Sequence, residues 1–236
     1  MQKDLKIKKG KVGNKMKKVL IFISIMLFLV PGLVQANSWS VNDPIEVSWG
    51  TLYDSYVSGS GSGGVATIKN NANGQSINTF CIELDETTTY STLVQDVSND
   101  EAIAGGRNTN GGDYISGATK WLYTQYLTGN YTNAGALTYA FWFLEDEYYD
   151  KATTPEEWKT WFISQGGNST LAAFAASYMT DALAHNSYTN ANILVLDTYD
   201  GTIKGQSFLY HVPEPASMLL LGLGLFGIGL VSRKKS

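Results

Sequence analysis

The sequence has little of the material from which disulfides, metal centres and histidine-based active sites are built. Its 236 residues include one cysteine and two histidines. A single cysteine excludes an intramolecular disulfide framework and a zinc site made of several thiolates. The two histidines, His185 and His211, leave few groups for proton transfer or metal binding. We therefore expect no cofactor and no metal, and we predict that the protein is not an enzyme.

Basic residues are scarce in the middle of the chain. Residues 37–212 contain 6 lysines and arginines against 19 aspartates and glutamates, a net charge of −13, whereas the whole chain carries −4. Such a segment repels nucleic-acid phosphates, so nucleic-acid binding is excluded. Hydrophobic residues make up 44% of the chain and aromatic residues 12%, which is enough to bury a core.

The N-terminal end has the three parts of a secretory signal. Within residues 16–36, two lysines precede the apolar stretch 19–30, and small residues up to Ala36 suit a signal peptidase. We predict a signal peptide over residues 1–36 that is cleaved after Ala36, with Met16 as an alternative start. A retained membrane helix is the alternative, but an apolar stretch of about 12 residues is too short to span a bilayer comfortably.

The C-terminal end combines a proline-rich tripeptide, an apolar stretch and a basic cluster. Residues 216–232 contain no charged side chain, and as a helix of about 1.5 Å per residue they would just span a bilayer core. The basic cluster would keep its end in the cytoplasm, because cytoplasmic flanks are enriched in positive charge. The flanking motifs are Pro213, Glu214 and Pro215 before the stretch, and Arg233, Lys234 and Lys235 after it.

Together these parts closely resemble the PEP-CTERM sorting signal, over residues 212–236. The resemblance implies recognition by an exosortase, a membrane-embedded transpeptidase-like enzyme of Gram-negative bacteria that make exopolysaccharide. It also implies a precursor in the inner membrane with its folded domain outside, and a mature form at the cell surface or in the extracellular biofilm matrix. The two prolines fit recognition by an enzyme, because they resist helix formation and keep the backbone extended.

Residues 37–211 predict a single exported α+β domain of strands with a helical insert. Thr154 and the Pro155 that follows it predict a helix start, with a threonine cap and proline at the first helical position. Alternating apolar and polar residues predict strands at 44–53, 65–69, 76–84, 87–97, 193–199 and 206–212. Helical spacing of apolar residues predicts helices over 114–127 and 134–149, from 155 onward, and over 169–184.

Two short motifs in this domain resemble the thioester domains of bacterial surface adhesins and of some PEP-CTERM proteins. They are the segment 80–84, which contains Cys81, and the segment 137–142. The resemblance implies a bond between the cysteine and a glutamine, but Thr138 occupies the glutamine position. Because a hydroxyl offers no carbonyl carbon to a thiol, that bond cannot form. Cys81 is then a buried small hydrophobe, an intermolecular disulfide partner, or the partner of Gln125 on the preceding helix.

Acidic clusters are the remaining candidate sites. We expect the acidic run Glu145, Asp146, Glu147 and Asp150 to be a solvated helix end, because neighbouring helical residues point in different directions. The oxygen-rich segments 108–113 and 197–201 suggest calcium ligands, but ordinary Asn/Asp/Gly turns account for both. We expect His185 to be a helix-end cation and His211 a linker residue.

Three functional hypotheses follow. The first is a non-enzymatic exported protein that works by adhesion or matrix binding, with exopolysaccharide or other surface proteins as partners. The second is a covalent adhesin with an internal thioester between Cys81 and Gln125. The third is an enzyme acting on exopolysaccharide through two carboxylates that share a cleft; its candidates are Asp85, Glu86, Glu145 and Glu147.

Overall fold

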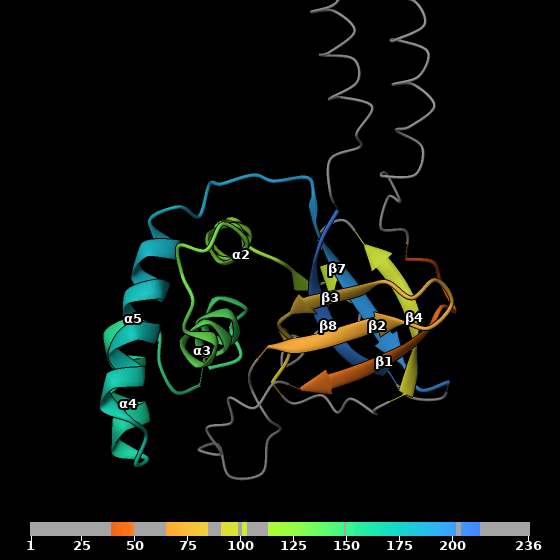
Figure 1. The fold of residues 1–236 in the computed structure, drawn as a ribbon. Coiled ribbons are helices and arrows are strands. Elements are labelled where there is room, and N and C mark those ends of the chain that lie inside the picture. Colours follow the sequence, from red (N-terminus) through yellow and green to blue (C-terminus); the bar gives the residue numbers. More distant parts are fainter. Residues whose placement is uncertain are drawn as a thin grey trace, which may run out of the picture. The chain divides into compact units, whose positions relative to one another are not determined.

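Six antiparallel strands form one curled sheet, in the order β3-β2-β1-β4-β7-β8 (Figure 1). The strands are β1 (Pro44–Trp49), β2 (Ala66–Asn70), β3 (Ser76–Thr79), β4 (Ser91–Ser98), β7 (Ile193–Tyr199) and β8 (Lys204–His211). Two shorter strands, β5 (Glu101–Ala102) and β6 (Asp113–Tyr114), pair with each other separately. The mixed helix and sheet content confirms the predicted α+β class.

This computed structural model describes part of the chain. The described residues are 39–49, 65–84, 91–98, 101–102, 113–148, 150–201 and 204–212. All of them belong to one compact unit, Trp39–Val212. The predicted signal peptide and the sorting tail lie outside them. Within these ranges, no helix has the length and apolar character needed to cross a membrane.

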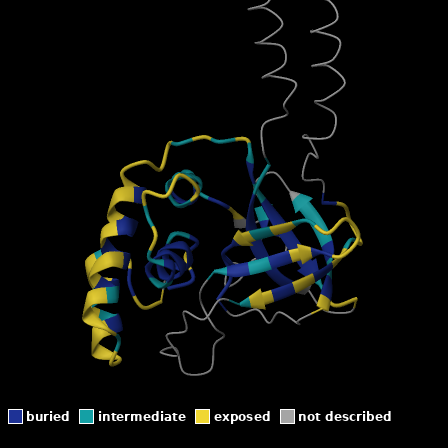
Figure 2. Ribbon diagram, viewed as in Figure 1, coloured by how far each residue is buried: buried dark blue, intermediate teal, exposed yellow. Residues whose placement is uncertain are grey.

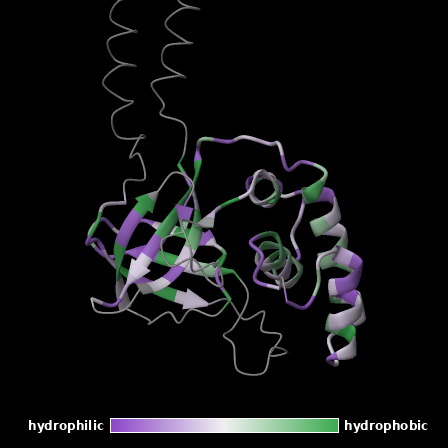
Figure 3. Cartoon of the chain, turned by 180° about the vertical axis from the view of Figure 1, so that it is seen from behind, coloured by the Kyte–Doolittle hydropathy of each residue, from purple (hydrophilic) through white to green (hydrophobic). Residues whose placement is uncertain are grey.

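The alternating sequence of β1 follows its two faces. Ile45 and Val47 are buried, whereas Glu46 and Ser48 are exposed. Successive side chains of a strand point to opposite faces, so this alternation places one face against the core. Figure 3 shows hydrophobic and hydrophilic residues alternating along the strands of the sheet.

The two edges of the sheet meet. After β3, the chain continues alongside β8: the Ile82 amide donates to the Ser207 carbonyl at 3.0 Å, and the Leu209 amide donates to the Phe80 carbonyl at 3.1 Å. The segment 80–82 therefore closes the sheet on itself. Closure satisfies backbone groups that an edge strand would leave open to other chains.

The four helices of the described residues gather on one side of the curled sheet (Figure 1). They are α2 (Gly117–Leu127), α3 (Ala134–Leu144), α4 (Pro155–Ser164) and α5 (Ser169–Leu183). Each begins at a polar cap whose side chain accepts a backbone N–H, and the caps are Ser116, Asn133, Thr154 and Asn168. The predicted helix start at Thr154 is confirmed as a capping box with Glu157.

Helix α3 is the centre of the helical side. Its residues from Ala136 to Phe143 are all buried, while α4 and α5 bury one face and expose the other (Figure 2). Phe80, which follows β3, packs against Phe141 of α3 and Tyr126 of α2 with ring centroids 5.1 and 4.9 Å apart. These contacts join sheet and helices in one hydrophobic core.

The predicted helix over 134–149 is too long, because α3 ends at Leu144. Asp146 has a φ of 61°, in the left-handed region, which a helix cannot continue through. The Asp146 amide donates to the Phe143 carbonyl at 3.2 Å, and the Glu147 amide to the Trp142 carbonyl at 2.9 Å. This pair of bonds is a Schellman motif, with aspartate where glycine is commonest.

Candidate functional site

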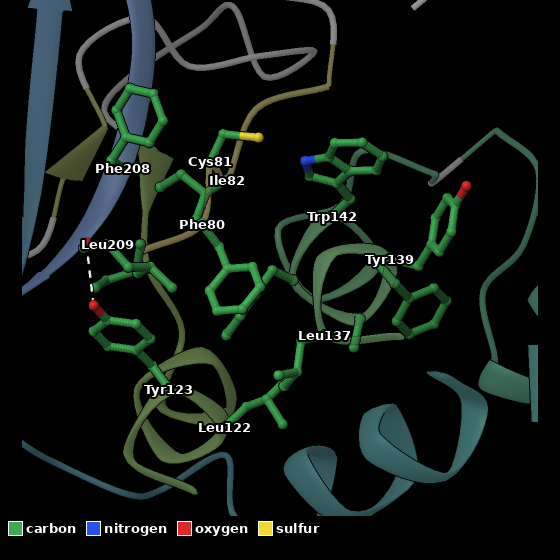
Figure 4. Close-up of a cluster of buried hydrophobic side chains, with 14 of the residues drawn as sticks. Phe80, Cys81, Ile82, Leu122, Tyr123, Leu137, Tyr139, Trp142, Phe208 and Leu209 are labelled. Atoms are coloured by element: carbon green, nitrogen blue, oxygen red, sulfur yellow. Dashed lines mark hydrogen bonds between the residues drawn. The ribbon is translucent and has the colours of Figure 1, made fainter. Parts of the chain in front are cut away.

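Cys81 lies where the closing segment of the sheet meets the helices. It forms an isolated bridge with Phe208 of β8, and its side chain is fully buried. In Figure 4 the indole nitrogen of Trp142, from α3, points toward the Cys81 sulfur. The fold thus brings together Cys81 and the tryptophan that closes the 137–142 motif.

The environment of Cys81 makes its thiol unreactive. Burial raises the pKa of the Cys81 thiol to about 12; the Trp142 side chain acts in the opposite direction, and the charges of Glu83 and Glu147 raise the pKa further. Because the thiolate is the nucleophilic form, a thiol with this pKa is almost entirely inactive at neutral pH. The interpretation of Cys81 as a buried small hydrophobe agrees with this environment.

Neither candidate partner for a thioester is available to Cys81. Thr138 is buried, and its hydroxyl donates to the Ala134 carbonyl of the same helix at 3.0 Å. The Gln125 amide oxygen accepts a hydrogen bond of 2.8 Å from the Asn130 side chain at an exposed position. The structure does not bring Gln125 to the buried thiol.

The interpretation of the acidic run as a solvated helix end is wrong for two of its members. Glu145 and Glu147 are only 6% and 1% exposed, whereas Asp146 and Asp150 are exposed as expected. The cause is the turn at Asp146, which reverses the chain and directs the two glutamates back into the protein. Sequence reasoning treated the segment as continuous helix and so missed this.

Both buried glutamates hold neighbouring segments in place. Glu147 Oε2 accepts the Leu84 amide at 3.1 Å, which fixes the end of the segment containing Cys81. Glu145 Oε1 accepts the Thr119 hydroxyl and the Ser116 amide, at the N-terminus of α2. A carboxylate is favourable at this position, because a helix N-terminus carries partial positive charge.

The acidic candidates that the structure describes are not arranged as a metal centre. Asp197, expected in a turn, is buried in β7 and accepts the Ser207 hydroxyl of β8 at 2.5 Å. In the part of the chain that the structure describes, no group of three or more His, Cys, Asp or Glu residues is arranged to hold a metal ion. Most of the segment 108–113, together with Asp85 and Glu86, lies outside that part.

The two histidines have different surroundings. His185 lies just after α5, with its ring stacked on Trp121 at a centroid distance of 4.1 Å and Nδ1 2.7 Å from the Asp181 carbonyl oxygen. His211 was expected to be a linker residue, but it is the last residue of β8 and pairs with Ile193. The folded domain therefore extends to within two residues of the Pro-Glu-Pro tripeptide.

His211 also lines an open groove that sequence reasoning did not anticipate. The groove has a volume of about 390 Å³ and lies between β3, the end of β8 and the C-terminal half of α2. Its lining residues are Ile77, Asn78, Tyr123, Tyr126, Leu127 and His211. No local pattern predicts it, because its residues come from three segments that only the fold brings together.

The comparisons with known proteins identify one feature of the chain. The family model of the PEP-CTERM protein-sorting motif matches residues 211–235. No curated protein and no solved structure matches the chain. The match begins at His211, so the sorting motif starts where the folded domain ends.

The chain is thus an exported protein whose sorting depends on an exosortase. More particularly, it carries the sorting motif of PEP-CTERM proteins, which are made as membrane-anchored precursors and processed for the cell surface. The residues that the sequence predicts to carry the sorting signal, Pro213 to Pro215 and the basic cluster from Arg233 to Lys235, lie within the matched range but outside the described residues.

Proposed function

We propose that this chain is a non-enzymatic protein that an exosortase delivers to the cell envelope or the exopolysaccharide matrix of a Gram-negative bacterium. There its folded domain, residues 39–212, works by adhesion or matrix binding. The observation that carries this proposal is the PEP-CTERM motif at residues 211–235, which begins at the last residue of the last strand. In the precursor, residues 216–232 span the inner membrane and Arg233 to Lys235 remain in the cytoplasm.

The surroundings of the candidate reactive groups support a role without catalysis. The Cys81 thiol is buried and its pKa is raised to about 12. Glu145 and Glu147 are buried and accept hydrogen bonds from the backbone of other segments. A carboxylate pair that cleaves glycosidic bonds must flank a cleft that admits the sugar. These two glutamates serve instead to hold the domain together.

Replacing both prolines of the tripeptide tests the sorting step. In the Pro213→Ala, Pro215→Ala variant we expect a full-length precursor to accumulate in the membrane fraction, because alanine, unlike proline, does not resist helix formation. Immunoblots of membrane, surface and medium fractions measure the ratio of precursor to processed protein. Ser217→Ala, within the apolar stretch, is the control and should be processed normally. Normal removal of the tail from the double variant would contradict the proposal.

A further inference from the structure

The residues that line the groove beside His211 carry no charge, although the same elements also contain Lys120 of α2 and Lys204 of β8. Although residues 37–212 carry a net charge of −13, the segments that build the groove and its rim contain no Asp, Glu, Lys or Arg. These segments are 70–82, 121–144, 186–196 and 205–212. Direct contacts hold them together: the Val212 amide donates to the Asn192 carbonyl at 2.8 Å, and the hydroxyls of Thr124 and Tyr188 are 3.3 Å apart.

The groove face combines apolar and aromatic groups with small polar ones. Leu127 is 44% exposed, and the rings of Tyr123 and Tyr126 stack with centroids 6.0 Å apart. Asn78 and His211 add neutral hydrogen-bonding groups at the edge. Tyr123 is buried beneath this face, so Leu127 and the partly exposed Tyr126 are what it offers to a partner. Tyrosine beside exposed aliphatic groups is the composition found at the membrane–water interface.

The length of the connection to the apolar tail fixes where this face lies in the precursor. Four residues, 212–215, separate His211 from the start of the apolar stretch at residue 216. From His211 to residue 216 there are five Cα–Cα steps, which reach about 18 Å at most when fully extended. The headgroup layer on each side of a bilayer is about 5–7 Å thick. His211, which lines the groove, is therefore held within about two headgroup layers of the membrane surface.

Electrostatic repulsion determines which face of the domain can point toward the membrane at the distance that the connection allows. Bacterial inner membranes carry anionic headgroups, and a strongly acidic domain held this close is repelled unless it presents its least charged face. The exposed acids Asp146, Asp150, Glu156 and Glu157 lie between α3 and α4 or in the first turn of α4, in segments other than those of the groove. Asp181 of α5 is also exposed, and it accepts the Tyr131 hydroxyl at 2.8 Å. Both the short connection, residues 212–215, and the charge distribution favour the groove face as the surface that faces the membrane.

We propose that the groove face rests on the headgroup layer of the bilayer that holds the sorting tail. It is then the membrane-facing surface of the precursor, with α4 and α5 directed away from the lipid. This inference rests on the proposed function, because it requires residues 216–232 to span the membrane.

The test uses the full-length chain in vesicles of phosphatidylethanolamine and phosphatidylglycerol. One variant carries a fluorophore at Leu127→Cys, in the groove, and the control carries it at Ile163→Cys, on α4, where the native side chain is 40% exposed. Cys81 is kept, because it is fully buried and takes up little label; the unmodified chain measures that background. Lipids with a nitroxide on the headgroup quench a fluorophore only when it is close to them.

We expect the label at 127 to be quenched several-fold more than the label at 163. Equal quenching of the two labels, or quenching of neither, would overturn the inference. Crosslinking between the cysteines at position 127 of two chains, without quenching, would also overturn the inference, because a second copy of the chain would then cover the groove. Vesicle flotation separates the two proposals. A chain that floats with the vesicles but is quenched equally at 127 and 163 refutes only the proposed orientation. A chain that does not float refutes the membrane-held precursor as well.

Discussion

The buried centre around Cys81 and the groove beside His211 share three segments of chain, and the centre also includes Trp142 of α3 and the glutamates that follow that helix. The segment of β3 and its continuation supplies Ile77 to the groove and Phe80 to the core. Helix α2 and strand β8 contribute to both regions in the same way. The centre holds the residue types that usually suggest chemistry, a thiol and carboxylates, and uses them for packing and hydrogen bonding. The groove holds none of them, and its position beside the sorting motif is what gives it a role.

This difference shows where a function can be sought in this fold. A buried thiol or carboxylate that packs or accepts hydrogen bonds contributes to the stability of the domain. An open neutral face close to the connection with the apolar tail instead contributes to the position of the domain at the membrane. Changes in the centre should therefore alter reactivity and stability, and changes in the groove should alter membrane contact alone. The four predictions below test that separation, from the largest expected effect to the smallest.

The largest expected difference is in thiol reactivity. With a pKa of about 12 instead of an ordinary value of 9.0, the Cys81 thiol has roughly 10³-fold less thiolate at pH 8. In the native protein we expect alkylation of Cys81 to be at least this much slower than alkylation of Leu127→Cys in the groove. Intact-mass measurements follow both reactions, and unfolding the protein should make the two rates equal. An intact mass that lacks one ammonia before any treatment would instead reveal a thioester.

The same pKa predicts how stability depends on pH. The folded-state pKa of Cys81 lies above its unfolded value, so the unfolded state loses its proton first. The contribution of this thiol is complete below pH 9 and is lost as the pH rises from about 9 to about 12. In denaturant titrations over this range, Cys81→Ala should show a shallower decline in the free energy of unfolding than the unmodified chain. Parallel declines would contradict a raised pKa.

A smaller effect is expected from the buried glutamate that holds the segment after Cys81. Glu147→Ala removes the acceptor of the Leu84 amide, and leaving a buried donor unsatisfied costs about 1–3 kcal/mol. Glu147→Gln keeps an oxygen acceptor and should lose less. Asp146→Asn is the matched control: the neighbouring side chain is exposed, and asparagine tolerates its left-handed backbone. Urea denaturation measures all three, and an equal loss in Asp146→Asn would mean that burial of Glu147 does not matter.

The sequence predicted the structural features that depend on neighbouring residues and missed those that depend on contacts between distant segments. The alternation of β1 and the capping box at Thr154 were predictable, because each depends on residues a few positions apart. The closure of the sheet by residues 80–82 depends on pairing with β8, more than a hundred residues later. The turn at Asp146 was missed because aspartate rarely replaces glycine there. The groove requires both the closure and the docking of α2, and so no sequence pattern encodes it.

The smallest expected effect concerns a single charge placed on the groove. Asn78 is exposed, and its side-chain oxygen accepts the Thr67 hydroxyl at 2.9 Å. Asn78→Asp keeps that acceptor, so the free energy of unfolding should change by less than about 0.5 kcal/mol. The added negative charge should nevertheless weaken contact with anionic vesicles by about 1 kcal/mol, lowering the quenching of a label at 127. High salt should restore the quenching, because it screens the repulsion. The control is Ser177→Asp, which adds the same charge on the exposed face of α5 and should leave the quenching unchanged. An equal loss of quenching in this control would mean that the net charge of the domain, and not the neutrality of the groove face, determines its contact with the membrane.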